Sequence, residues 1–307
     1  MRKISLLLIA ASALTLASPA LAHRQWLLPQ ATTFSGANDW VSVDAAVSND
    51  LFFADHFPMR VDTIKVWAPD GSPGEIANGA LGHYRSTFDV KLDKPGTWKI
   101  GTASSGFSGS FKDDGVEWRV GGRGGPPGAG GPGAAATGPK PTPTSAPANA
   151  PAPGQPGAPR PSVPTVADIP ANATDVVLTE SSSRNEIFVT AGAPTTTVLK
   201  PSGKGLEMSP VTHPDELVAN EEARFIFLVD GKPAANLKVT LVPGGKRFRD
   251  TEGAFEVTTG KDGVAAIKWP AAGMYWLNAS ATDARTTTPR ATQRRMSYTS
   301  TLEVSAP

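Results

Sequence analysis

The sequence predicts an all-β protein made of two antiparallel β-sandwich domains of the immunoglobulin-like type, with a disordered Pro/Gly-rich insertion. Three observations predict this fold. Apolar and polar residues alternate over many short runs, turn signals such as Pro-Gly and Asp-Gly separate these runs, and no stretch beyond residue 22 keeps a 3.6-residue period. Glycine (31) and proline (29) are abundant in the 307 residues, and a large share of them falls in one segment.

The first 22 residues have the organisation of a secretory signal peptide. Arg2 and Lys3 precede an apolar run over 4–16, and Ala20 and Ala22 supply small residues where a signal peptidase reads the chain. Cleavage after residue 22 predicts a periplasmic protein, and export without cysteine fits a bacterial periplasm. The apolar run is shorter than the roughly 20 residues of a membrane-spanning helix, and we expect no transmembrane segment in the mature chain.

The N-terminal sandwich domain is expected to cover residues 23–204. Turn signals at 69–71 and 95–96 separate its alternating runs. The predicted strands lie at 40–47, 61–67, 84–92, 97–102, 117–120, 175–179 and 186–190. The glycine-flanked serine segment at 106–109 does not have the spacing of a nucleophile elbow, and it is interpreted as a loop.

Residues 121–165 are predicted to be a disordered insertion in this first domain. They hold 11 glycines, 13 prolines, three charged residues and no aromatic residue. Such a composition buries too little apolar surface to offset the entropy lost on ordering the chain. Strand-like runs follow at 172–200, and the second domain has about seven strands without them. The insertion is therefore placed inside the first domain rather than between the two domains.

Residues 205–307 form the second predicted sandwich, and their number is close to the roughly 100 residues of an immunoglobulin-like unit. Phe225, Phe227 and Val229 share one face of the first clear strand. Further alternating runs lie at 237–241, 255–257, 265–269, 274–279 and 296–304, with turn signals at 230–233, 243–245 and 261–263.

The composition excludes several kinds of chemistry. Lys and Arg total 29 against 28 for Asp and Glu, so the net charge of +1 gives no reason to expect a nucleic-acid partner. The absence of cysteine excludes disulfides, thiol catalysis and cysteine-based metal sites. Glycine fingerprints for phosphates or dinucleotides are also absent, and we expect no enzymatic activity. Most of the seven tryptophans lie in alternating runs, which favours core packing over a sugar-binding face.

Histidine supplies the candidate metal ligands, which are His23, His56 and His83. Signal cleavage would leave His23 at the N-terminus, with a free α-amine beside its imidazole, and the run 26–29 is expected to anchor that terminus. Nitrogen ligands suit nickel, cobalt, copper(II) or zinc. No close histidine spacing exists, so such a site would have to be assembled across strands. His213, beside a proline, is expected to be a hydrogen-bonded structural histidine.

Three segments resemble a known family. They are the start "AHRQWLLP", the segment 206–210 leading into a strand and the turn at 230–233, and the run "DGVAAIKWPAAGMYWLNA". These features are similar to the periplasmic NikM-like family associated with nickel and cobalt uptake, long catalogued as a domain of unknown function. The resemblance covers nearly the whole mature chain except the insertion. It implies a periplasmic accessory or substrate-binding component of transition-metal uptake, whose partner would be a membrane transport component.

The leading hypothesis is therefore a non-enzymatic periplasmic protein that binds a divalent transition metal, or a complex of that metal, for uptake. One alternative is a metal-free structural or adhesion module that presents its two sandwiches to a partner. A third reading is a copper oxidase with its site at the N-terminal histidine, which resembles polysaccharide oxygenases through that terminus alone.

Overall fold

The structure is a computed structural model that describes residues 23–121 and 160–307. The predicted signal peptide and residues 122–159 of the predicted insertion lie outside the described residues. The described part contains nineteen strands and four short 3-10 helices, which confirms the all-β prediction. Among these residues, no helix combines the length and the apolar character needed to cross a bilayer.

The first sheet, sheet A, is antiparallel and comes from the N-terminal part of the chain. Its strand order is β1–β3–β7–β6, and β4 also pairs with β3. The bounds are β1 (Arg24–Pro29), β3 (Asp39–Ser48), β4 (Phe57–Pro58), β6 (Ala77–Leu81) and β7 (Ser86–Leu92).

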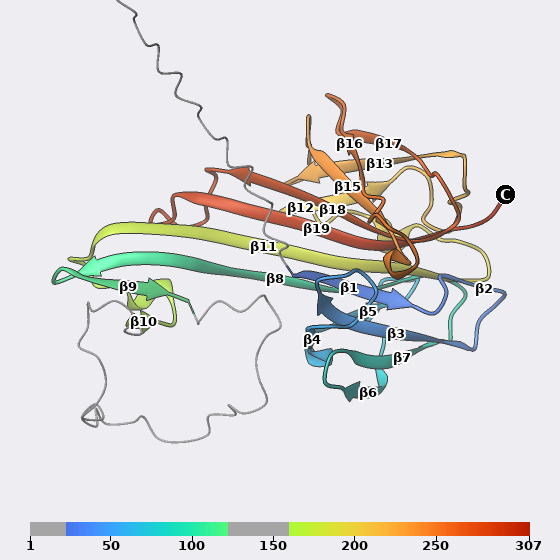
Figure 1. Ribbon diagram of the computed structural model, residues 1–307, viewed down its shortest axis with the longest axis horizontal. Coiled ribbons are helices and arrows are strands. Elements are labelled where there is room, and N and C mark those ends of the chain that lie inside the picture. Colours follow the sequence, from blue (N-terminus) through green and yellow to red (C-terminus); the bar gives the residue numbers. More distant parts are fainter. Residues whose placement is uncertain (1–22, 122–159) are drawn as a thin grey trace, which may run out of the picture.

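Sheet B is the largest sheet and runs through the whole molecule, as Figure 1 shows. Its order is β10–β9–β8–β11–β19–β18–β15–β16, with β2 beside β11 and β5 beside β8. Most pairs are antiparallel, but β11 pairs with β19 and with β2 in parallel, as β10 does with β9. The bounds are β2 (Thr33–Phe34), β5 (Lys65–Trp67), β8 (Gly96–Asp113), β9 (Val116–Val120), β10 (Ser162–Val163), β11 (Thr174–Ala191), β15 (Lys238–Pro243), β16 (Phe255–Thr258), β18 (Gly273–Asp283) and β19 (Gln293–Val304).

Sheet C covers the C-terminal part of sheet B. Its order is β12–β13–β14, with β17 on the other edge of β13, and all its pairs are antiparallel. The bounds are β12 (Leu206–Pro210), β13 (Glu222–Val229), β14 (Lys232–Pro233) and β17 (Val264–Lys268). The 3-10 helices lie in connections, at η1 (Val61–Thr63), η2 (Val166–Asp168), η3 (Thr197–Leu199) and η4 (Lys246–Phe248).

Two main cores lie on opposite faces of sheet B. Ile187 and Val189 of β11 face the first core, which sheet A closes with residues such as Val43. Phe188, between them on the same strand, faces the second core, which sheet C closes with Phe225. Sheet B is thus common to both sandwiches. The predicted boundary at 204/205 falls in the connection between η3 and β12.

The segment at 106–109 is not the predicted loop, because it lies inside the 18-residue strand β8. Likewise, the runs predicted separately at 175–179 and 186–190 are parts of one 18-residue strand, β11. The glycines and serines are held extended because β8 pairs with β11 along most of its length and with β9 near its end. Pairing with neighbouring strands has overridden a weak local propensity.

The predicted insertion at 121–165 extends too far at its C-terminal end. Ser162–Val163 forms β10, which pairs in parallel with the end of β9. Thr165 then caps η2, since its hydroxyl and its backbone N–H both donate to the Asp168 carboxylate.

Candidate functional site

Two of the three candidate ligands, His23 and His56, lie against each other. Their imidazole rings are stacked, with centroids 3.7 Å apart and an angle of 8° between the ring planes. The register of sheet A explains this contact: Arg24 pairs with Ser48, and Phe57 pairs with Val47. The residues just before β1 and just before β4 therefore meet beyond the same end of β3.

The histidine pair is open to solvent on a base of ordered protein. Both imidazoles are exposed. The ring of Phe57 lies against both of them, with centroids 4.5 Å from His56 and 6.1 Å from His23. A ligand from solution can reach the ring nitrogens without unfolding any part of the described structure.

The loop that carries His56 is fixed by the Asp55 carboxylate. Its Oδ1 accepts a hydrogen bond from the Asn49 backbone N–H at 2.9 Å, and its Oδ2 accepts one from the Asn49 side-chain amide at 3.3 Å. Asp50 forms an ion pair with Lys246 at 2.5 Å, which joins this loop to the loop around η4. His56 thus projects from a loop with defined contacts at its base.

The start of β1 is anchored as predicted for the run 26–29. Trp26 is 1% exposed, and its indole N–H donates to the Ser48 hydroxyl at 2.7 Å. The indole N–H of Trp276 donates to the Gln25 carbonyl at 3.1 Å. The Arg24 guanidinium lies over the Trp276 ring and forms an ion pair with Glu252 at 2.6 Å. His23 is therefore attached directly to a well-packed strand.

His83 does not join this pair. It lies exposed in the turn between β6 and β7, at the edge of sheet A, with its ring edge-on to Tyr84 at 4.4 Å. In the ranges 23–121 and 160–307, no three His, Asp or Glu side chains are grouped so as to hold a metal ion. The structure thus supplies two neighbouring imidazoles rather than a complete set of ligands.

His213 is buried and hydrogen-bonded, as predicted for a structural histidine. Its Nδ1 accepts a hydrogen bond from the Asp215 backbone N–H at 3.1 Å. Its Nε2 lies 3.1 Å from the Thr97 hydroxyl and 3.2 Å from the Thr195 carbonyl oxygen. Both ring nitrogens are therefore occupied by partners that tie β8 to two neighbouring loops.

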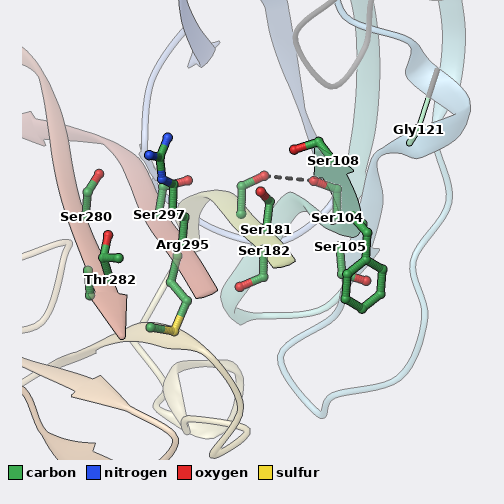
Figure 2. Close-up of a pocket in the computed structure, with 15 residues that line it drawn as sticks. Ser104, Ser105, Ser108, Gly121, Ser181, Ser182, Ser280, Thr282, Arg295 and Ser297 are labelled. Carbon is green, nitrogen blue, oxygen red and sulfur yellow. Dashed lines mark hydrogen bonds between the residues drawn. The ribbon is translucent and has the colours of Figure 1, made fainter. Parts of the chain in front are cut away.

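A trough on sheet B, shown in Figure 2, was not predicted from the sequence. The trough has a volume of about 590 Å³, and small hydroxyl-bearing side chains form much of its floor. Ser280 and Thr282 come from β18, Ser297 and Arg295 from β19, and serines of β11 and β8 complete the floor. The runs of serine were visible in the sequence, but their alignment across four strands depends on the topology.

Comparison with known proteins gives a family but no activity. Residues 20–283 match the family described as a domain of unknown function, DUF4198. No curated protein matches the chain. The D0-D1 domain of intimin is 10% identical with a TM-score of 0.19, covering 91% of this chain and 97% of that one. The human OSCAR ligand-binding domain is 8% identical with a TM-score of 0.19, covering 92% and 99%.

Proposed function

The chain belongs to the DUF4198 family of unknown function, and we propose that it binds a divalent transition metal through His23 and His56 as a periplasmic accessory of metal uptake. The observation that carries this proposal is the contact between two exposed imidazoles that the sequence separates by 33 positions. The description of the matching family names neither nickel nor cobalt. That association comes from the resemblance to the NikM-like family.

The donor set favours nickel(II) or copper(II). Rotation about the side-chain torsions would turn a nitrogen of each imidazole toward one ion, because both rings are exposed. Cleavage after Ala22 would add the α-amine of His23 as a third nitrogen. Nitrogen donors completed by water in a tetragonal arrangement are typical of copper(II) and nickel(II) sites. The anchored start of β1 limits the ordering entropy that binding has to overcome.

Uptake is a more fitting role than storage for such a site. Two or three protein ligands on an exposed surface leave other coordination positions to water, so an ion could be passed on to another protein by ligand exchange. The proposed partner is a membrane transport component, in line with the NikM-like resemblance. Protons compete with metal ions for imidazole nitrogens, so affinity should fall as the pH is lowered.

The test uses the mature protein, starting at His23, in calorimetric titrations with nickel(II) and copper(II) at pH 7.5. His23→Ala and His56→Ala should each weaken binding by more than about tenfold, because even the loss of a hydrogen-bond partner of a metal ligand typically costs about tenfold or more in affinity. His83→Ala is the matched control, because it removes an exposed histidine outside the pair. If both pair variants bind as tightly as the parent, the site is wrong.

A version with one extra alanine before His23 separates the two donors of that residue, since it blocks the terminal amine but keeps the ring. If this version binds weakly although its imidazole is intact, the terminal amine is the dominant ligand.

The copper oxidase hypothesis is tested on the copper-loaded protein with ascorbate. Oxygen consumption that is lost in His23→Ala would favour an oxidase over a carrier, and the absence of metal binding by the parent would favour the metal-free module.

A further inference from the structure

The serine runs of β8, β11, β18 and β19 are aligned in the structure. These strands are neighbours in sheet B, in the order β18–β19–β11–β8. Ser280 pairs with Ser297, Ser297 with Ser183, and Ser183 with Ser104. One row of four serines therefore crosses four strands on one face of the sheet. Two residues further along, the next row contains Thr282, Arg295 and Ser181, followed by Gly106.

Toward the first core, the same face becomes covered. The row beyond the four serines consists of Asn278, Thr299, Asn185 and Thr102. Asn185 is 0% exposed, and neither its amide nitrogen nor its amide oxygen has a hydrogen-bond partner. A buried amide without partners costs free energy. Asn185 thus projects from the same face of sheet B as the serine row, two residues along β11 from Ser183, where that face is already covered.

The fold does not require serine at these positions. Serine has a low preference for strands compared with threonine or valine, and an exposed sheet face accepts longer polar residues. Small side chains on four strands instead leave a hollow of about 590 Å³. Ser104 and Ser183 hydrogen-bond to each other at 2.8 Å. In the described part of the chain, the hydroxyls of Ser181, Ser280 and Ser297 have no such partner and are available to a ligand.

The chemistry of the floor limits the kind of ligand. The backbone groups of these inner strands are used in the sheet, so an added peptide strand would have no ladder to join on this face. The hydroxyls can both donate and accept hydrogen bonds, which matches the hydroxyls of a sugar. Arg295 adds an exposed guanidinium at the floor, and guanidinium groups pair well with carboxylates.

We propose that this trough binds an acidic oligosaccharide, with Arg295 on a carboxylate and the serine row on the sugar hydroxyls. The site is separate from the histidine pair and does not depend on metal binding. None of the seven tryptophans lines the trough. The ligand would therefore lie on a hydroxyl floor rather than on an aromatic face.

The test measures binding of tetrasaccharides of galacturonate, of mannuronate and of hyaluronan to the full mature protein by calorimetry, with maltotetraose as the neutral comparison. We expect at least one acidic tetrasaccharide to bind at least tenfold more tightly than maltotetraose. Arg295→Gln should remove that preference. Ser183→Leu with Ser297→Leu should fill the trough and abolish binding, whereas Thr258→Leu, on the exposed edge strand β16, should have no effect.

Asn185→Leu is a control for effects of substitution on the sheet itself, because it removes an unsatisfied amide and leaves the floor of the trough unchanged. This variant should stay folded, and its affinity should change less than threefold if the serine row and Arg295 carry the binding. The melting temperature of every variant is measured alongside. Failure of all three acidic tetrasaccharides to bind overturns the proposal. So does equal binding by maltotetraose, or unchanged binding by the filled variant. None of these readouts depends on the histidine pair.

Discussion

The strands β8 and β11 each have a covered half and an open half, and the two halves are extended for different reasons. In the covered half, Ile100 and Ile187 pair across the strands and are fully buried under sheet A. In the open half, Ser104 and Ser183 pair in the same ladder, but Ser104 is exposed to solvent and Ser183 is only half-buried. Burial of apolar side chains stabilises the first half, whereas the second half depends on its neighbouring strands.

The largest expected effect comes from a pair of substitutions on one strand. Ile187→Ala in the covered half should lower the free energy of unfolding by about 3 kcal/mol, because it opens a cavity in a packed core. Ser183→Ala in the open half should change it by less than about 0.5 kcal/mol, because it removes one exposed hydrogen bond. Urea unfolding followed by circular dichroism measures both. Similar losses from the two variants would contradict the distinction between the halves.

Gly109 is the position in the open half where a substitution should destabilise the fold nearly as much as one in the covered half. A Cβ at this position would overlap the carbonyl oxygen of Val177, at the point where the register between β8 and β11 shifts. Gly109→Ala should therefore lower the free energy of unfolding by about 2 kcal/mol through overpacking. Gly106→Ala is the matched control on the same strand, since nothing lies within 4 Å of the added carbon. Equal stability of the two variants would show that the backbone shifts at residue 109 to accommodate the added Cβ.

A third prediction concerns ionic contacts beside the open half. Hydrogen bonds from Arg294 lower the pKa of Asp283 to about 2, and Arg294 also pairs with Asp230. A carboxyl with a depressed pKa stabilises the folded state above its unfolded pKa of about 3.9, and this contribution is lost as the pH falls toward 2. The loss should be about 1 kcal/mol, because the Asp283 side chain is 23% exposed. Thermal melts between pH 5 and pH 2 should show a smaller decline for Asp283→Asn than for the parent. If the melting temperatures of the parent and of Asp283→Asn fall in parallel, Asp283 does not contribute to the pH dependence of stability.

The same contrast explains how much of the fold the sequence could predict. Alternation identified the covered strands, because burial on one face imposes a period of two. Phe225 and Phe227 were predicted to share a face, and both are fully buried. The glycine-flanked serine segment at 106–109 has no such period, so it was interpreted as a loop. Its extended conformation depends on β9 and β11, which lie on either side of it in the sheet; β9 follows after a short turn, but β11 is far away in sequence.

For the candidate site, the sequence identified residues but not their arrangement. His23 stood out because of the predicted cleavage position and the apolar run that follows it. Its contact with His56 rests on the short strand β4, which has two residues and pairs with the end of β3. A strand of two residues carries no periodicity, so neither this pairing nor the separate location of His83 could be read from the pattern.

The position of β11 has a consequence for how the protein unfolds. With Ile187 in one core and Phe188 in the other, this strand cannot leave one sandwich without disturbing the other. The two sandwiches should therefore unfold together in one cooperative transition rather than as independent domains. Pulled from its ends, such a chain should give way in a single event, because the element that resists is common to both halves.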